Sequence, residues 1–179
     1  MTTPQRHFVD VWNPSYASNA MEAHLAVLLS ADQEYVWWGK VRSSNRQQPL
    51  RHLAAALEIG AELEADQDRE GHLYLTDYRS LYVAHIDTIT PGEEVPADPA
   101  TVPAYYAHNR LNCDFWYKLL DIRRLVADDT IAVIAELKQL RNPEYHNRPV
   151  SLYGGWWISR SSWSGLTAGG SSTPRCAIR

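Results

Sequence analysis

Residues 34–47 read EYVWWGKVRSSNRQ, and they predict a strand that leads directly into a basic segment. Neighbouring side chains of a strand point to opposite faces, so Trp37 and Trp38 cannot both enter one core. Lys40 and Arg42 stand at even spacing from Trp38 and therefore share its face. This face would place an aromatic ring beside cations that contact phosphate. The alternative is that both tryptophans are packing residues of the interior.

The composition is that of a folded protein with an unusual share of aromatic residues. The chain has 179 residues, 45% hydrophobic and 21% charged, which is enough for one domain with a core. Its seven Trp and ten Tyr can fill that core or face a planar ligand. The formal net charge of −4 argues mildly against broad nonspecific binding of nucleic acid.

The charge is spread unevenly along the chain. Residues 34–51 carry four basic side chains and one acid, whereas residues 58–70 carry six acids and one arginine. This pattern allows a basic face on an acidic body. An ordinary solvated surface explains the same pattern equally well.

The sequence contains no signal for export or membrane insertion. No apolar run approaches the roughly 20 residues of a membrane helix. The N-terminus, MTTPQRHFVDVW, has no apolar signal region. Cys113 and Cys176 form no disulfide or metal-binding pattern, which suits a reducing compartment. We therefore expect a cytoplasmic protein with no membrane partner.

Hydrophobic periodicity predicts strands and helices that do not alternate regularly. One helix is expected after Asn19, which can form a capping box with Glu22. Others are expected from Pro49 and after Asp128 or Asp129. The expected strands cover residues 7–12, 34–43, a hairpin at 72–89, 114–125 and the end of 142–155.

This order predicts an α+β protein that forms a small, partly open β-barrel flanked by helices. A doubly wound sheet fits less well, because the chain has neither a GxGxxG motif nor a P-loop. Residues 91–103 hold four prolines and predict an extended surface loop rather than a core element. Residues 1–155 are expected to form a single domain.

Residues 156–179 differ from everything before them. They read WWISRSSWSGLTAGGSSTPRCAIR, with three arginines, no acids and no periodicity. A disordered tail explains this composition. A shift of reading frame also explains it, because bases that encode WWISRSSW encode VDLPLIV when they are read two nucleotides further on. Sequencing the gene distinguishes the two, and we assign no function to this segment.

Catalytic and metal-binding motifs are absent from the sequence. The seven histidines form no HxH, HExxH or Cys/His pair, so we expect no metal and no cofactor. His85 is more typical of a strand than of a base, and Cys113 of a small buried residue than of a nucleophile. There is no GxSxG motif. An enzyme is therefore the least favoured class.

Two short motifs resemble a known family. The expected first strand ends in WNPS, residues 12–15, and a helix separates it from VWWGKVRSSNR, residues 36–46. This is similar to the start of EVE domains, which belong to the PUA-like barrels with the YTH and ASCH domains. NRPVSLYGG, residues 147–155, looks like the Asn-Lys-Pro-Val segment near the end of YTH domains. The resemblance covers residues 7–155.

The resemblance implies a pocket that accepts a modified nucleobase. Trp37 or Trp38 would form one wall, and Asn13 and Ser15 would contact the edge of the base. Candidates for the other wall are Tyr78, Tyr105, Tyr106 and Trp116. The cations expected to bind phosphate are Lys40, Arg42 and Arg46. The insert at 91–103 and the acidic balance depart from the family pattern.

We therefore expect a non-enzymatic domain that recognises a modified base in DNA or RNA through an aromatic pocket. It would serve as the recognition part of a larger prokaryotic system, together with a protein partner or effector subunit. One alternative is a sensor of a small molecule or nucleotide on the same barrel. Another is a protein-interaction module that uses the acidic helix and the Pro-rich loop.

Overall fold

The computed structural model describes residues 6–15, 17–42, 50, 53–66, 68–126 and 156–159, without the side chains of Arg6, Val126 and residues 156–159. Its main elements, in chain order, are β1 (Arg6–Val11), α1 (Ala20–Leu28), β2 (Val36–Val41), α2 (Leu53–Ala65), β3 (Gly71–Thr76), β4 (Leu81–Pro91), β5 (Cys113–Val126) and β6 (Trp156–Ser159). The strands expected at 7–12, 34–43 and 114–125 and the hairpin at 72–89 are therefore confirmed.

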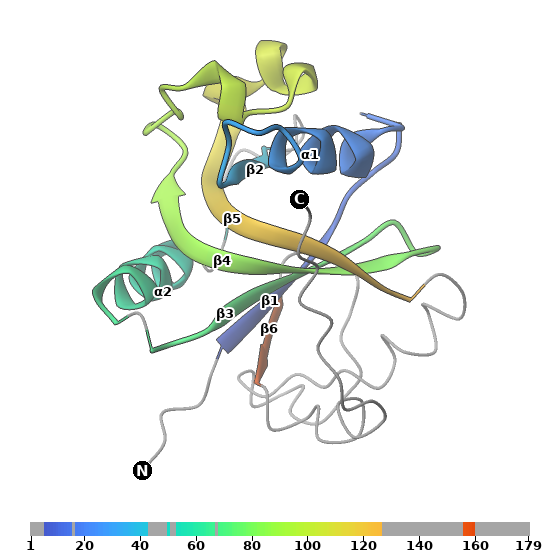
Figure 1. Ribbon diagram of the computed structural model, residues 1–179. Coiled ribbons are helices and arrows are strands. Elements are labelled where there is room, and N and C mark those ends of the chain that lie inside the picture. The colour runs from blue at the N-terminus through green and yellow to red at the C-terminus, as the bar shows by residue number, and fades with distance from the viewer. Residues whose placement is uncertain are drawn as a thin grey trace.

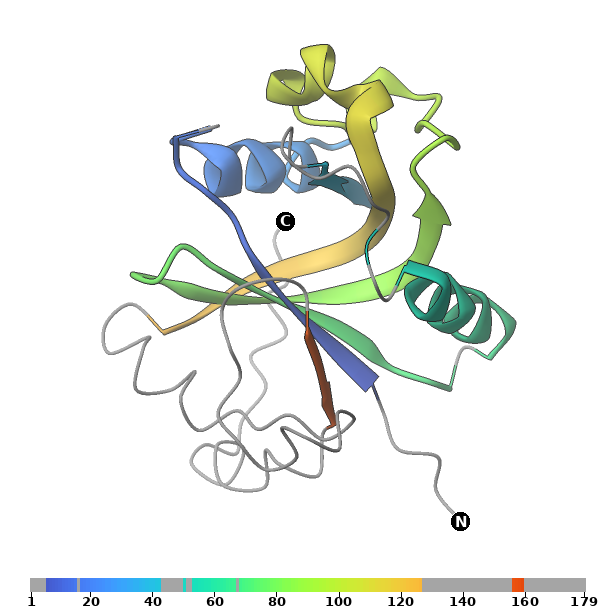
Figure 2. The ribbon, with the colours of Figure 1, turned by 180° about the vertical axis from the view of Figure 1, so that it is seen from behind.

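The strands described here form one mixed sheet in the order β2-β5-β4-β3-β1-β6. β1 runs parallel to β3, and the other neighbouring pairs are antiparallel. The long strands β4 and β5 bend strongly, so the end of the sheet that carries β2 rises away from β3 and β1 (Figures 1 and 2). The expected α+β class is confirmed, and the sheet is open, with β2 and β6 at its edges.

The main core lies between this bent sheet and the two helices. Phe8 of β1 is in register with Leu73 of β3 and packs edge-on against Tyr117 of β5, with 5.3 Å between ring centroids. Val36 and Trp38 enter the same cluster from β2. Burial of large apolar side chains of this kind supplies most of the stabilisation of a domain.

Helix α1 begins at Ala20, so Asn19 occupies the N-cap position as predicted. The predicted side-chain cap is wrong, because the Asn19 side chain makes no capping hydrogen bond. Its backbone carbonyl instead accepts from the Ala23 amide at 2.9 Å. Helix α2 begins at Leu53, whose amide donates to the Leu50 carbonyl at 3.0 Å, and Pro49 lies outside the described residues.

The prediction that residues 91–103 form only a surface loop is wrong in part. Strand β4 continues to Pro91, and Thr101 and Val102 are buried, with exposed fractions of 1% and 6%. Short 3₁₀ helices follow at Pro99–Thr101, Ala104–His108 and Arg110–Asn112. Val102 joins a second core cluster with Tyr106, Cys113 and Trp116. The insert thus forms a wall against β2 and β5.

Some of the predicted elements lie outside the residues that the structure describes. The helix expected after Asp128 or Asp129 and the segment 142–155 lie outside the described residues. Residues 156–159, which we placed in the atypical tail, form β6 and pair with β1. The sheet therefore extends past residue 155, while residues 160–179 again lie outside the described part.

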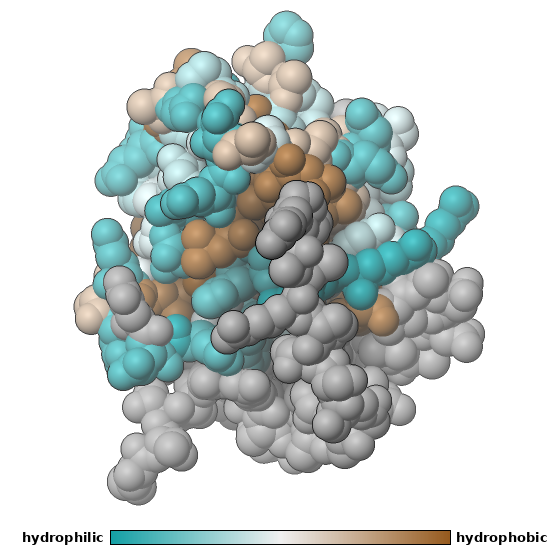
Figure 3. All heavy atoms as spheres, in the orientation of Figure 1, coloured by the Kyte–Doolittle hydropathy of each residue, from teal (hydrophilic) through white to brown (hydrophobic). Residues whose placement is uncertain are grey.

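Both helices contribute apolar side chains to the main core. Leu25 and Leu28 of α1 and Leu53 and Leu57 of α2 are partly buried against it. On the face shown in Figure 3, hydrophobic residues run as a band between the regions of the two helices, bordered by polar residues. No helix in the described part of the chain is both long and apolar enough to cross a membrane.

Gly60 allows α2 to approach β4 closely, and this gives a first prediction. A Cβ atom at Gly60 would lie 2.6 Å from the Ile89 carbonyl oxygen and 2.8 Å from the Ile89 Cβ. Gly→Ala inside a helix normally stabilises by about 1 kcal/mol. We expect Gly60→Ala instead to lower the free energy of unfolding by about 1–3 kcal/mol, because the helix must move off the strand. Urea denaturation measures this change.

The matched control is Ala61→Gly on the exposed side of the same helix. It should cost about 1 kcal/mol through helix propensity alone. A stabilising effect of Gly60→Ala would contradict the close packing.

Candidate ligand-binding site

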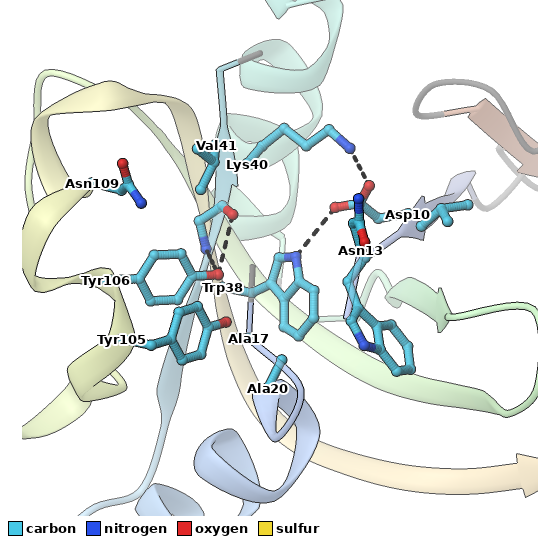
Figure 4. A pocket seen from close by; sticks show the side chains of 13 residues that line it. Asp10, Asn13, Ala17, Ala20, Trp38, Lys40, Val41, Tyr105, Tyr106 and Asn109 are labelled. Carbon is cyan, nitrogen blue, oxygen red and sulfur yellow. Dashed lines mark hydrogen bonds and ion pairs between the residues drawn. The ribbon is translucent and has the colours of Figure 1, made fainter. Parts of the chain in front are cut away.

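A pocket of about 160 Å³ lies where the ends of β1 and β2 meet the start of α1. Asp10, Trp12 and Asn13 line it from the end of β1 and the loop that follows. Lining residues on the other elements include Ala17, Ala20, Trp38, Lys40, Tyr105, Tyr106 and Asn109. Ligand sites of roughly 300–1,000 Å³ are typical for drug-sized molecules, so this pocket suits one small planar group. Figure 4 shows its side chains.

Trp38 is both a core residue and a wall of the pocket. Its side chain is almost fully buried, and its ring lies on the His24 ring with 4.4 Å between centroids and 32° between planes. Trp12 meets it edge to face at 6.2 Å. The alternative that Trp38 is a packing residue therefore holds in part, yet the same ring lines the pocket.

Asp10 and Lys40 form a charged pair in the pocket. The Lys40 ammonium donates to Asp10 Oδ1, and the indole N–H of Trp38 donates to Asp10 Oδ2 at 3.2 Å (Figure 4). The Asp10 side chain is 5% exposed and that of Lys40 is 21% exposed. Lys40 and Trp38 thus share a face of β2, as strand alternation predicts, but the cation is already paired with a carboxylate.

Tyr105 and Tyr106 form a second aromatic wall. Their rings lie 4.3 Å apart at 32°. The Tyr106 hydroxyl donates to the Gly39 carbonyl at 3.1 Å and accepts from the Gly39 amide at 3.0 Å. Burial raises the pKa of both phenols, and the nearby Asp10 charge adds to this for Tyr105. Both tyrosines were candidates for the other wall, and the structure brings them to the pocket beside Trp38.

Of the two residues expected at the edge of the base, Asn13 lines the pocket and Ser15 does not. Both are exposed. The Ser15 amide donates to Asn13 Oδ1 at 2.9 Å. This bond fixes the amide orientation of Asn13, so that its NH₂ group remains as the donor.

The other predicted site residues lie away from this pocket. Trp37 is half-buried on the opposite face of β2, against the second core cluster. Trp116 is fully buried in that cluster, 5.1 Å from the Tyr106 ring, and does not line the pocket. Arg42 pairs with buried Asp114 at 3.2 Å. Arg46 lies outside the described residues.

Trp12 separates this pocket from a second cavity of about 470 Å³. Met21 and Glu22 of α1 line that cavity, as do Arg79 and Tyr82 near the β3–β4 turn. The turn is held by Asp77, whose carboxylate accepts from the Ser80 amide at 2.8 Å. Tyr78, a further candidate for the other wall, lies in this turn with a positive φ of 71° and does not line the first pocket.

Burial keeps two titratable side chains near the site uncharged around neutral pH. Burial and the Asp114 charge raise the pKa of the Cys113 thiol to about 12, so the thiolate is scarce near neutral pH. Burial lowers the pKa of His24 to about 4, which keeps its imidazole neutral. Within the described residues, no three His, Cys, Asp or Glu side chains are grouped to hold a metal ion. The arrangement favours binding by shape and hydrogen bonds.

Comparisons with family models, curated proteins and solved structures found no significant match.

Asp10 is the main pocket residue that the sequence reasoning missed. It follows Phe8 at even spacing in the strand HFVDVW, so alternation places it on the inward face. A carboxylate at an inward strand position requires a buried partner, and this is the signal that could have identified it. The partner, Trp38, stands 28 residues further along the chain.

Buried His24 predicts a pH dependence of stability. The unfolded chain protonates this group below about pH 6.5, whereas the folded chain resists protonation down to about 4. The unfolded state therefore binds more protons in this window, and stability falls as the pH falls. Between pH 7 and pH 5 we expect a loss of about 2 kcal/mol from this group. Urea denaturation at each pH measures it.

His24→Phe should remove this part of the pH dependence while retaining an aromatic ring against Trp38. His108→Phe, at an exposed position, should keep it. If the loss between pH 7 and pH 5 is unchanged in His24→Phe, the neutral buried imidazole is not its source.

Proposed function

We propose that this chain is a non-enzymatic recognition domain that binds a modified nucleobase of DNA or RNA in the pocket beside Trp38. One observation supports this proposal above all. A single small pocket combines two aromatic walls, Trp38 and the Tyr105–Tyr106 pair, with the polar groups of Asp10 and Asn13. Aromatic walls stack on a flipped base, and polar groups read its edge.

The bent, open sheet supports the same proposal. The resemblance to EVE domains implies a partly open PUA-like barrel in which a tryptophan of the Trp-Gly strand walls the pocket and residues just after the first strand contact the base. The pocket of this chain is lined by residues of β2 and of the end of β1. On this proposal the domain is the recognition part of a larger prokaryotic system.

A sensor of a free nucleoside or nucleotide is the second candidate, and one observation favours it. The two described cations of the basic segment, Lys40 and Arg42, are each paired with a carboxylate. Paired cations attract phosphate less strongly than unpaired ones, so the pocket can serve a free ligand without a track for the backbone.

The first test removes one aromatic wall. We expect Tyr105→Leu to weaken the binding of modified oligonucleotides or nucleosides about 5- to 150-fold, since each stacked base contributes about 1–3 kcal/mol. Tyr105 suits this test better than Trp38, whose truncation would also open the core. Fluorescence anisotropy with modified and plain oligonucleotides, and thermal shift with nucleosides, measure binding.

The matched control is Tyr35→Leu, a half-buried tyrosine that packs on Trp37 away from the pocket. It should leave affinity unchanged. Equal weakening by both variants, or no binding of any probe above background, would contradict the proposal.

The second test separates the two candidates through Arg42. For a reader of nucleic acid, Arg42→Ala should lower oligonucleotide affinity, reduce the salt dependence by about one phosphate contact, and leave nucleoside affinity unchanged. Titrations at several salt concentrations measure this. Oligonucleotides that bind no more tightly than their nucleosides, with no dependence on salt, would favour the sensor instead.

A further inference from the structure

The Asp10 carboxylate is a buried polar group of the pocket that is held by two hydrogen bonds. Its two oxygens accept hydrogen bonds from two donors on β2, the Trp38 indole N–H at 3.2 Å and the Lys40 ammonium. Both donors come from one strand, so the carboxylate cannot rotate without breaking a buried bond. It therefore presents a fixed direction to whatever enters the pocket.

An ionised carboxylate accepts hydrogen bonds at about four positions and donates none. Trp38 and Lys40 occupy one position on each oxygen of Asp10. The remaining positions can only accept. A ligand atom that meets this group must bring a hydrogen, because a carbonyl oxygen or a bare ring nitrogen there would face a negative charge.

The neighbouring polar groups do not replace Asp10 in this role. The Tyr106 hydroxyl is engaged by the backbone of Gly39, as both donor and acceptor. Asn13 keeps its NH₂ group as a donor, because its oxygen accepts from Ser15. Among these groups, Asp10 supplies the fixed acceptor and Asn13 a donor near the mouth of the pocket.

We propose that Asp10 is the specificity-determining residue of this pocket and selects a base that presents an amino group, with a ring nitrogen beside it for Asn13. Modified cytosine and adenine have such an edge. In the same pose, modified uracil and hypoxanthine would place an oxo oxygen against the Asp10 carboxylate and a ring N–H against the Asn13 NH₂ group, so neither contact would form. This inference rests on the proposed function, because it names the class of base that the pocket takes.

The test uses pairs of nucleosides that differ in the amino or oxo group. The probes are 5-methyl-2′-deoxycytidine against thymidine, and N6-methyl-2′-deoxyadenosine against 2′-deoxyinosine, each titrated by calorimetry. We expect the amino member of at least one pair to bind about tenfold or more tightly than its oxo partner. Asp10→Asn, whose amide can also donate, should remove or reverse this preference.

Asp10→Asn leaves Lys40 without its carboxylate, so the double variant Asp10→Asn with Lys40→Gln keeps the test usable if the single variant unfolds. Trp38→Phe gives an independent arm, because it removes the donor that orients Asp10 and keeps a ring; it should weaken the preference. Asp114→Asn is the matched control, since Asp114 is buried and paired with Arg42 outside the pocket. It should leave the preference unchanged.

The outcomes separate this inference from the proposed function. Binding without preference within either pair, preference for the oxo member, or an unchanged preference in the Asp10 variants would overturn the role of Asp10 alone. Failure of every nucleoside and oligonucleotide to bind would overturn it together with the proposed function.

Discussion

The packing of the Trp38 ring is the constraint on which the rest of the site depends. The ring lies on His24 of α1, meets Trp12 edge to face, and donates its N–H to Asp10 of β1. One side chain of β2 therefore fixes the helix, the first strand and the loop after it. Trp38 itself, Trp12 and Asp10 also line the pocket, so its shape follows from the core packing.

The absence of a side chain at Gly39 allows Trp116 and Cys113 of β5 to pack closely against β2. A Cβ at Gly39 would lie 2.6 Å from the Trp116 ring and 2.8 Å from Cys113 Sγ. β2 is an edge strand, and the Tyr106 hydroxyl bonds both the amide and the carbonyl of Gly39. The phenol thus takes the place of a further strand at this point of the edge, and satisfies two groups that would otherwise be open to pairing.

Helices and strands with a clear hydrophobic periodicity could be predicted from the sequence. Contacts between segments that are far apart in the sequence could not. Alternation placed Trp37 and Trp38 on opposite faces, and turn residues around Asp77 marked the hairpin. Tyr105 and Tyr106 could be named only as candidates, because they lie on a short 3₁₀ helix just after the Pro-rich insert, where the sequence has no hydrophobic period. Trp116 was expected at the site as an aromatic residue, but composition does not distinguish a core ring from a pocket ring.

Two ion pairs, Lys40 with Asp10 and Arg42 with Asp114, limit the free energy that a phosphate contact can contribute to binding. A phosphate that approaches Lys40 must compete with Asp10, and one that approaches Arg42 must compete with Asp114, whose side chain is only 1% exposed. A buried carboxylate that loses its cation is strongly destabilised. A phosphate would therefore share each cation with the carboxylate rather than displace the carboxylate. Pairing therefore weakens a phosphate contact at these cations, and on the proposed function the larger share of the affinity would arise inside the pocket. This agrees with the net charge of −4, which repels nucleic acid at long range. On the proposed function, such a domain would gain selectivity for the base at the expense of nonspecific attraction.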